Sequence, residues 1–155
     1  MKVYGQYISG ERGLTNIDLY RYARELKIDN FRGVFMRDAL PKVAHRKECG
    51  IVNFNTSEQA GSHWVCYYKD TKNERIYFDS FGQVTLEEIQ KYLKSKEEFE
   101  SGKAVIQRNT DIVQRVNTRV CGHLCLFVLT SLVREHLTFQ EVLNILNDGY
   151  TRGDW

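Results

Sequence analysis

The middle of the chain holds segments rich in Val, Ile, Tyr and Phe, a composition typical of β-strands. Two of these segments are separated by the polar sequence DTKN, which predicts a turn and therefore a hairpin. FRGVFM upstream and KAVIQ downstream are shorter candidates for extended structure. The predicted strands are residues 49–55, 63–70 and 74–81, with 31–36 and 103–107 as the shorter candidates.

Hydrophobic residues at helical spacing occur before and after these strands, in segments that begin with helix-capping residues. Gly149 predicts the end of the last helix, because glycine is common just beyond a helix C-terminus. The charged stretch KEEFE, residues 96–100, is interpreted as a solvated helix end. The predicted helices are 14–27 with Thr15 and Asn16 as N-cap candidates, 85–95 with a Thr85/Glu88 capping box, and 138–148 with a Thr138/Glu141 capping box.

One further helix differs from the others because it is apolar on almost every side. Its sequence, GHLCLFVLTSLV, suits a helix only when neighbouring elements cover all its faces. We expect it to run from Cys121 to about Glu135 as the central helix of the chain. The predicted fold class is α+β, a small, mainly antiparallel or mixed sheet packed against this buried helix, with flanking helices. No repeat or linker divides the chain, so residues 1–155 are predicted to form one domain.

Composition and charge exclude several classes of protein. Of the 155 residues, 42% are hydrophobic and 27% charged, which excludes a disordered or collagen-like chain. The net charge of +2 is too close to neutral to indicate a nucleic-acid-binding protein. The sequence shows neither an apolar run of about 18 residues, as a membrane span requires, nor a secretory signal at its start. We therefore expect an intracellular protein, cytoplasmic, nuclear or packaged in a particle, whose thiols stay reduced.

The chain has four cysteines, which in a reducing compartment are candidates for buried apolar residues, catalytic thiols or metal ligands. Cys121 differs from Cys49, Cys66 and Cys125 because it opens the buried helix. The free N–H groups and positive dipole end of a helix start favour a thiolate. Gly122 leaves room for backbone N–H groups to approach a developing oxyanion. The alternative is that Cys121 is an inert buried cysteine.

Three polar residues are candidates to complete a catalytic site around that thiol. His63 lies at the start of one hairpin strand and Asp79 at the end of the other, and a hairpin brings such positions together. A carboxylate there holds an imidazole in the tautomer whose second nitrogen is free for the thiol. Gln114, seven residues before Cys121, lies in a loop that can fold back and present an amide N–H to the oxyanion. Ordinary polar residues at strand ends and in a loop are the alternative.

A structural zinc site made of Cys121, His123 and Cys125, with Cys66, is a competing hypothesis. Residues 121 and 125 share a helix face, but residue 123 points away and the sequence has no CxxC knuckle, so no metal is expected. The first 47 residues carry ten Lys or Arg against five Asp or Glu. This excess is either a weak patch for an anionic partner or a solvated face.

Three sequence blocks, AGSHWV, IYFDSFG and QRVNTRVCGHLC, resemble in order the catalytic blocks of the adenovirus-type (adenain-like) cysteine proteases. FRGVFMRDALP and ECGIVNFN upstream also resemble that family, so the similarity covers roughly residues 28–132. These proteases are related more distantly to the SUMO- and ubiquitin-like-specific proteases. The resemblance implies Cys121 as nucleophile, His63 as general base, Asp79 as its acidic partner, Gln114 in the oxyanion hole, Trp64 beside the substrate channel, and Asn117 as a residue of the viral loop pattern.

The resemblance therefore implies a cysteine endopeptidase that cleaves after glycine-containing sites and processes viral or virus-like structural precursors. A ubiquitin-like or SUMO deconjugating isopeptidase and a catalytically inactive binder of such tails are the alternatives. Asp79 departs from the glutamate usual in adenoviruses. Residues 102–120 contain no cysteine to bond a peptide cofactor, so we expect no cofactor, at most weak DNA binding, and a monomer located inside the host cell or in the virion.

Overall fold

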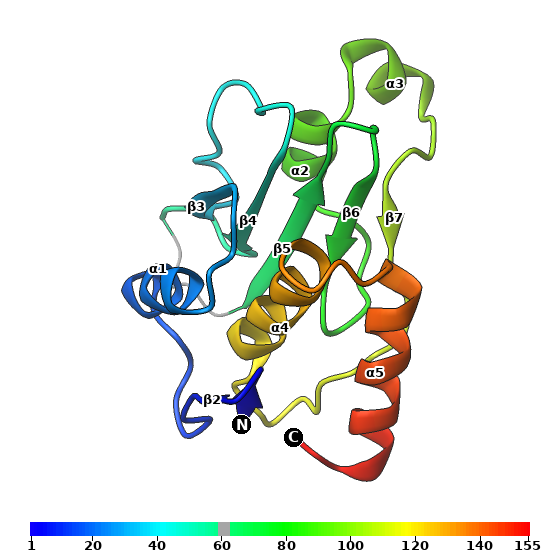
Figure 1. The fold of residues 1–155 in the computed structure, drawn as a ribbon. Helices are drawn as coiled ribbons and strands as arrows, with labels where there is room; N and C mark the ends of the chain where they lie inside the picture. The colour runs from blue at the N-terminus through cyan, green and yellow to red at the C-terminus, as the bar shows by residue number, and fades with distance from the viewer. Residues whose placement is uncertain (59–62) are drawn as a thin grey trace.

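The computed structural model describes residues 1–58 and 63–155, whose elements are labelled in Figure 1. The helices are α1 (Asn16–Glu25), α2 (Glu87–Leu93), α3 (Lys96–Ser101), α4 (Cys121–Val133) and α5 (Phe139–Arg152). The strands are β1 (Lys2–Val3), β2 (Gln6–Tyr7), β3 (Phe31–Met36), β4 (Glu48–Asn53), β5 (Trp64–Lys69), β6 (Arg75–Phe78) and β7 (Gln107–Arg108). None of the helices in these two ranges is long and apolar enough to cross a membrane.

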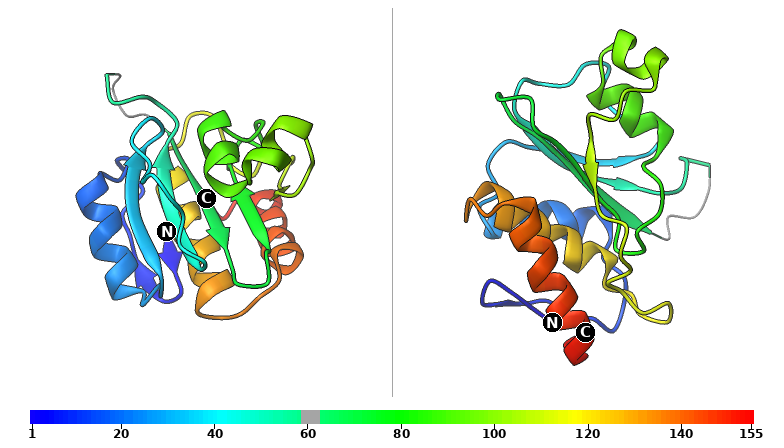
Figure 2. Two further views of the ribbon diagram at one scale, coloured as in Figure 1. Left: turned by 90° about the horizontal axis from the view of Figure 1, so that it is seen from above. Right: turned by 90° about the vertical axis from the view of Figure 1, so that its right-hand side faces the viewer.

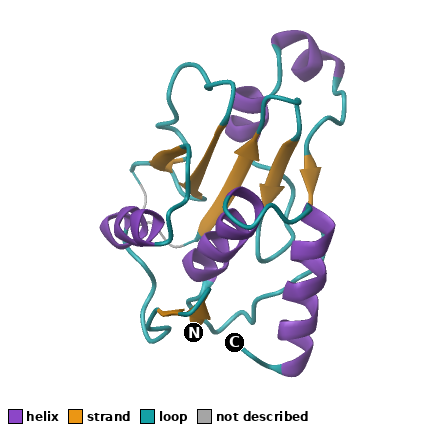
Figure 3. Ribbon diagram, viewed as in Figure 1, coloured by secondary structure: helices purple, strands orange, loops and turns teal. Residues whose placement is uncertain are grey.

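A mixed sheet with the strand order β3-β4-β5-β6-β7 forms the centre of the molecule (Figure 3). Its inner pairs, β4 with β5 and β5 with β6, are antiparallel, and its outer pairs, β3 with β4 and β6 with β7, are parallel. The predicted hairpin is confirmed, because Cys66 of β5 pairs with Phe78 of β6. The α+β class is confirmed as well.

Side chains alternate across the sheet and divide the apolar interior into two layers. Cys66 and Phe78 face the layer that contains α4, whereas Tyr67 and Tyr77 face the layer that contains α2. Figure 2 shows α2 and α3 on one side of the sheet and α4 on the other. Helix α4 is buried at 12 of its 13 residues, as its apolar sequence predicts.

The predicted N-caps of the first and last helices are confirmed, and that of the middle helix is wrong. Thr15 and Thr138 each form a capping box, with Asp18 and Glu141 respectively. At α2 the N-cap position is Leu86, which makes no side-chain cap. The Glu88 carboxylate, which a capping box would turn back to the backbone, instead binds the Arg37 guanidinium at 2.8 and 3.0 Å.

Residues 96–100 are not the end of the preceding helix. They belong to α3, a separate short helix that begins with a capping box between Ser95 and Glu98. The strand candidate 103–107 is largely irregular, and β7 overlaps it only at Gln107. Helix α4 ends at Val133, two residues before the expected end.

Gly149 does not end α5, which continues to Arg152 and stops at Gly153 in the left-handed conformation, with φ 77°. Gly149 has a packing role instead, because the Trp155 ring lies against its Cα, where a Cβ would clash. The indole N–H of Trp155 donates to the Val113 carbonyl at 2.6 Å, which fixes the ring there.

Candidate active site

The hairpin of β5 and β6 brings His63 and Asp79 together at the end of the sheet. His63 directly precedes β5 and Asp79 directly follows β6, and His63 Nε2 lies 2.7 Å from Asp79 Oδ1. Asp79 is fully buried, and its Oδ1 also accepts the Phe81 backbone N–H at 2.9 Å. With Nε2 facing the carboxylate, Nδ1 is the ring nitrogen left for another partner.

Asn109 holds the backbone of Asp79 in place from the loop after β7. Its Oδ1 accepts the Asp79 N–H at 3.0 Å, and its Nδ2 donates to the Asp79 carbonyl at 2.6 Å. Asn109 is 4% exposed, so water does not compete for these two hydrogen bonds. The amide thus extends the pairing of β6 and β7 by one residue and fixes the carboxylate.

Cys121 is the first residue of α4, and its side chain lies near His63. The Cys121 thiol is close enough to the imidazole to raise the pKa of His63. The Trp64 backbone N–H donates to Cys121 Sγ at 3.5 Å, so the residue after the histidine also contacts the sulfur. Free N–H groups of the first turn of α4 and the helix dipole add further positive potential there.

The protonation of His63 follows from these contacts. Burial lowers the pKa of His63, but the hydrogen bonds from the ring to Asp79 and Cys121, and their negative charges, outweigh burial and raise it to about 9. The ring is packed between Phe54 and Phe81, with centroid distances of 5.9 and 4.8 Å. A cationic imidazole next to a thiol stabilises the thiolate at neutral pH.

Two of the other cysteines have surroundings that disfavour a thiolate. Burial raises the pKa of the Cys49 thiol far above its usual range, and it raises the pKa of Cys125 in the same way. Cys125 lies one turn beyond Cys121, where its thiol donates to the Trp64 carbonyl at 3.5 Å. All four cysteines are free and buried.

Gln114 is connected to the same strand end through Ser80. Its Oε1 lies 2.5 Å from Ser80 Oγ, and its Nε2 donates to the Thr118 carbonyl at 3.1 Å. The Val113 backbone N–H donates to the Ser80 carbonyl at 2.9 Å, so the loop before α4 folds back as expected. Gln114 is 2% exposed.

Gly122 has a packing reason for lacking a side chain. A Cβ at this position would lie 3.3 Å from Leu14 and Leu19, closer than usual packing allows. The first turn of α4 therefore packs directly on α1 and the segment before it. That segment positions Leu14 against Trp64, whose indole N–H donates to the Leu14 carbonyl at 2.8 Å.

A cleft of about 500 Å³ opens at Cys121. The segment before α1 and strand β3 line it, as does Trp64. Asn117 does not line this cleft; it lies exposed in a neighbouring hollow together with Thr118 and Val120. The lining residues of the cleft are Gly13, Leu14, Thr15, Asn16, Val34, Phe35, Met36, Asn53, Trp64, Arg119 and Cys121.

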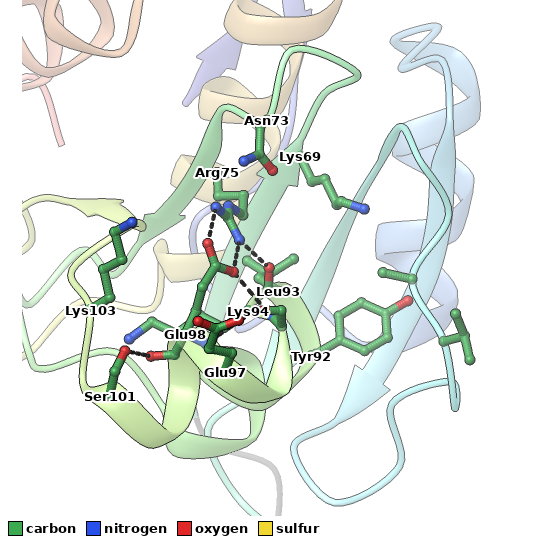
Figure 4. Close-up of a pocket in the computed structure, with 13 residues that line it drawn as sticks. Lys69, Asn73, Arg75, Tyr92, Leu93, Lys94, Glu97, Glu98, Ser101 and Lys103 are labelled. Atoms are coloured by element: carbon green, nitrogen blue, oxygen red, sulfur yellow. Dashed lines mark hydrogen bonds and ion pairs between the residues drawn. The ribbon is translucent and has the colours of Figure 1, made fainter.

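A second, larger hollow of about 660 Å³ lies at the opposite end of the sheet, between the β5–β6 turn and α3 (Figure 4). Its centre is the buried Arg75, which binds both carboxylate oxygens of Glu98, at 2.8 and 3.0 Å, and the Leu93 carbonyl at 2.9 Å. These contacts attach α3 to β6. The charged residues at the centre of this hollow therefore have a structural role, and we assign no catalytic site to it.

The zinc hypothesis fits the geometry poorly. His123 points away from both cysteines of α4, and its Nε2 lies 2.7 Å from the Ser9 carbonyl. Burial lowers the pKa of His123 and keeps the ring neutral. Within residues 1–58 and 63–155, no group of three or more His, Cys, Asp or Glu side chains is placed to hold a metal ion.

The sequence predicted the four polar candidates but missed the residues that support them: Ser80, Asn109, Phe54 and Phe81. Ser80 and Phe81 belong to the IYFDSFG block, and their place next to Asp79 in that block is the one sequence feature that could have indicated their role. Residues 60–62 of the AGSHWV block lie outside the described residues.

A mixed sheet with a buried helix across it, and a cysteine at the start of that helix facing a histidine and an aspartate, define the class of cysteine proteases. The model of the adenovirus endoprotease family matches residues 31–148, and the chain belongs to this family. Curated protein sequences contain no match to this chain.

Among solved structures, the chain is similar to the crystal structure of the selenomethionine form of the ASFV pS273R protease. The TM-score is 0.56 at 16% sequence identity, over 84% of this chain. The matched region spans 61% of that protease, so the likeness concerns the fold of a part of it.

Proposed function

We propose that this chain is a cysteine endopeptidase in which Cys121 is the nucleophile, His63 the general acid and base, and Asp79 the residue that orients His63. The observation that carries the proposal is the 2.7 Å contact between His63 Nε2 and Asp79 Oδ1, beside a Cys121 thiol close enough to raise the pKa of the same ring. An inert binding module has no need for a buried imidazolium beside a thiol at a helix start.

In the proposed reaction the Cys121 thiolate attacks the scissile carbonyl carbon. The carbonyl oxygen becomes an oxyanion, which accepts hydrogen bonds from backbone N–H groups at Cys121 and Gly122 and from Gln114 Nε2. His63 then donates its proton to the leaving amine, and the carbonyl re-forms as a thioester. Water, deprotonated by His63, hydrolyses the thioester and returns Cys121 as a thiolate.

We propose that the substrate is a protein or peptide with glycine next to the scissile bond. Support comes from Trp64, whose backbone N–H contacts Cys121 Sγ and whose indole is fixed to the Leu14 carbonyl. A wall fixed so close to the nucleophile leaves little space for a side chain on the residue that occupies it. Precursor processing in a virion or infected cell is part of this proposal, as is a substrate contact for Asn117.

The test uses the purified chain in reducing buffer and two probes: a capsid-type Gly-Gly peptide and ubiquitin-like proteins that carry a C-terminal vinyl sulfone. We expect cleavage of the peptide by the wild type and none by Cys121→Ala. Cys49→Ala is the matched control, because it removes a buried thiol outside the site and should retain activity. Labelling of Cys121 by the vinyl sulfones without peptide cleavage would favour a deconjugase, and equal activity of Cys121→Ala would overturn the proposal.

A further inference from the structure

The hydroxyl of Ser80 is a buried polar group that the mechanism above does not use. Ser80 is 0% exposed and directly follows Asp79. Its Oγ lies 2.5 Å from Gln114 Oε1, across a separation of 34 residues. A buried hydroxyl that hydrogen-bonds to a distant side chain restricts the orientation of that side chain, here the Gln114 amide.

The direction of this hydrogen bond is determined by Thr118. A backbone carbonyl oxygen only accepts, so the Gln114 atom at 3.1 Å from it must be the NH₂ group. The atom facing Ser80 is therefore the amide oxygen, and Ser80 must be the donor. With Oε1 fixed, the amide plane is fixed too, and the second N–H of Gln114 has a defined direction.

The Ser80 carbonyl holds the same loop, since it accepts the Val113 N–H at 2.9 Å. Ser80 thus binds the backbone before Gln114 and also its side chain. Its neighbour Asp79 binds His63 at 2.7 Å. Asp79 and Ser80, adjacent at the end of β6, therefore hold the His63 imidazole and the Gln114 amide respectively.

We propose that Ser80 is a positioning residue for Gln114 and fixes its Nε2 in the direction of the oxyanion. This inference rests on the proposed function, in which Gln114 supplies an oxyanion donor. A donor that is fixed before reaction stabilises the transition state without reorganisation, whereas a freely rotating amide loses much of that effect.

The kinetic test compares Ser80→Ala, Gln114→Ala and the double variant. Removing an oxyanion donor costs about 10² in kcat, and we expect Ser80→Ala to lower kcat by about 10-fold with an unchanged KM. In the Gln114→Ala background the same change should have no further effect, because the residue it positions is gone. Ser131→Ala, which removes a remote buried hydroxyl on α4, is the matched control and should leave kcat unchanged.

Alkylation of Cys121 by iodoacetamide distinguishes this role from an effect on Asp79. Alkylation forms no oxyanion, so its rate at pH 6 should be the same in Ser80→Ala as in the wild type. An unchanged kcat in Ser80→Ala, a loss that persists fully in the Gln114→Ala background, or slower alkylation would each overturn the inference.

A readout without turnover keeps this inference separate from the proposed function. Hydrogen exchange of the Gln114 side-chain NH₂, followed by NMR, should be slow in the wild type and faster in Ser80→Ala. If the wild type cleaves no peptide but this difference is seen, the proposed function fails and the positioning of Gln114 stands. If the exchange rates are equal, Ser80 does not fix the amide, whatever the activity.

Discussion

At the scale of residues, the contact between His63 and Asp79 controls the protonation of the site. Burial alone would keep the imidazole neutral, and the buried carboxylate reverses that preference. The cationic ring is what distinguishes Cys121 from the cysteines that are equally buried.

Cys121 should be the most reactive thiol of the protein at low pH. Brief treatment with iodoacetamide near pH 6 is expected to modify Cys121 ahead of Cys49, Cys66 and Cys125, because only Cys121 has a cationic partner and a helix start. Peptide mapping by mass spectrometry measures the order of labelling. Equal labelling of all four cysteines, or earlier labelling of another, would contradict the assignment of the nucleophile.

The pH profile of cleavage should report the raised pKa of His63. The imidazolium persists below a pKa of about 9, so kcat/KM should fall on the alkaline side near that pH. Asp79→Asn removes the carboxylate that raises the pKa, while the burial that lowers it remains. The alkaline limb should therefore move down by at least about one pH unit. A limb at an unchanged pH in Asp79→Asn would show that another group titrates there.

At the scale of elements, the features that local sequence determines, such as turns and helix starts, were predicted. The hairpin follows from the DTKN turn, and its register alone brings His63 and Asp79 to one end of the sheet. The start of α4 at Cys121 follows from the change from a polar loop to an apolar run. These two local features account for three of the four candidate residues.

What the sequence could not show depends on contacts between distant segments. The Thr85/Glu88 pattern is the same as that at Thr138, yet the N-cap of α2 is Leu86 and the Glu88 carboxylate binds Arg37, a distant residue, instead. Asn109 and Ser80 gain their roles only because the loop after β7 returns to the end of β6. Spacing along the chain carries no information about either contact.

Gly149 gives a prediction for α5 that opposes helix propensity. In an open helix, Gly→Ala stabilises by up to about 1 kcal/mol, but here a Cβ would displace the Trp155 ring from the helix. Gly149→Ala should therefore lower the melting temperature and change the tryptophan fluorescence. Asp148→Ala, at the exposed neighbouring position, is the control and should do neither. A melting temperature raised by Gly149→Ala would show that the contact with Trp155 is dispensable.

At the scale of the whole molecule, the sheet separates two apolar layers, and only one of them supports the candidate site. One layer holds α4, and with it the nucleophile, against β5. The other layer, with α2 and the attached α3, closes the far face and contributes none of the four candidate residues. The candidate site thus lies at the sheet end where the α4 layer meets the loop before α4, and its parts come from segments far apart in the sequence.

The burial of the cysteines leads to the last prediction, which concerns activation. A mixed disulfide with a peptide needs an accessible thiol, yet Cys49 and Cys125 are 0% exposed and Cys66 is 1% exposed. Cys121 is 6% exposed and is the proposed nucleophile. Purified chain 1–155 should therefore cleave its peptide in dithiothreitol alone, and the addition of oxidised cysteine-containing peptides should not raise the rate. Duplex DNA should change the rate little at physiological salt, because a net charge of +2 gives little counterion release. Activity that appears only with a disulfide adduct at Cys49 or Cys66, detected by intact mass, would mean that one of these thiols becomes exposed. A strict requirement for DNA would mean that the basic residues act together as one binding surface.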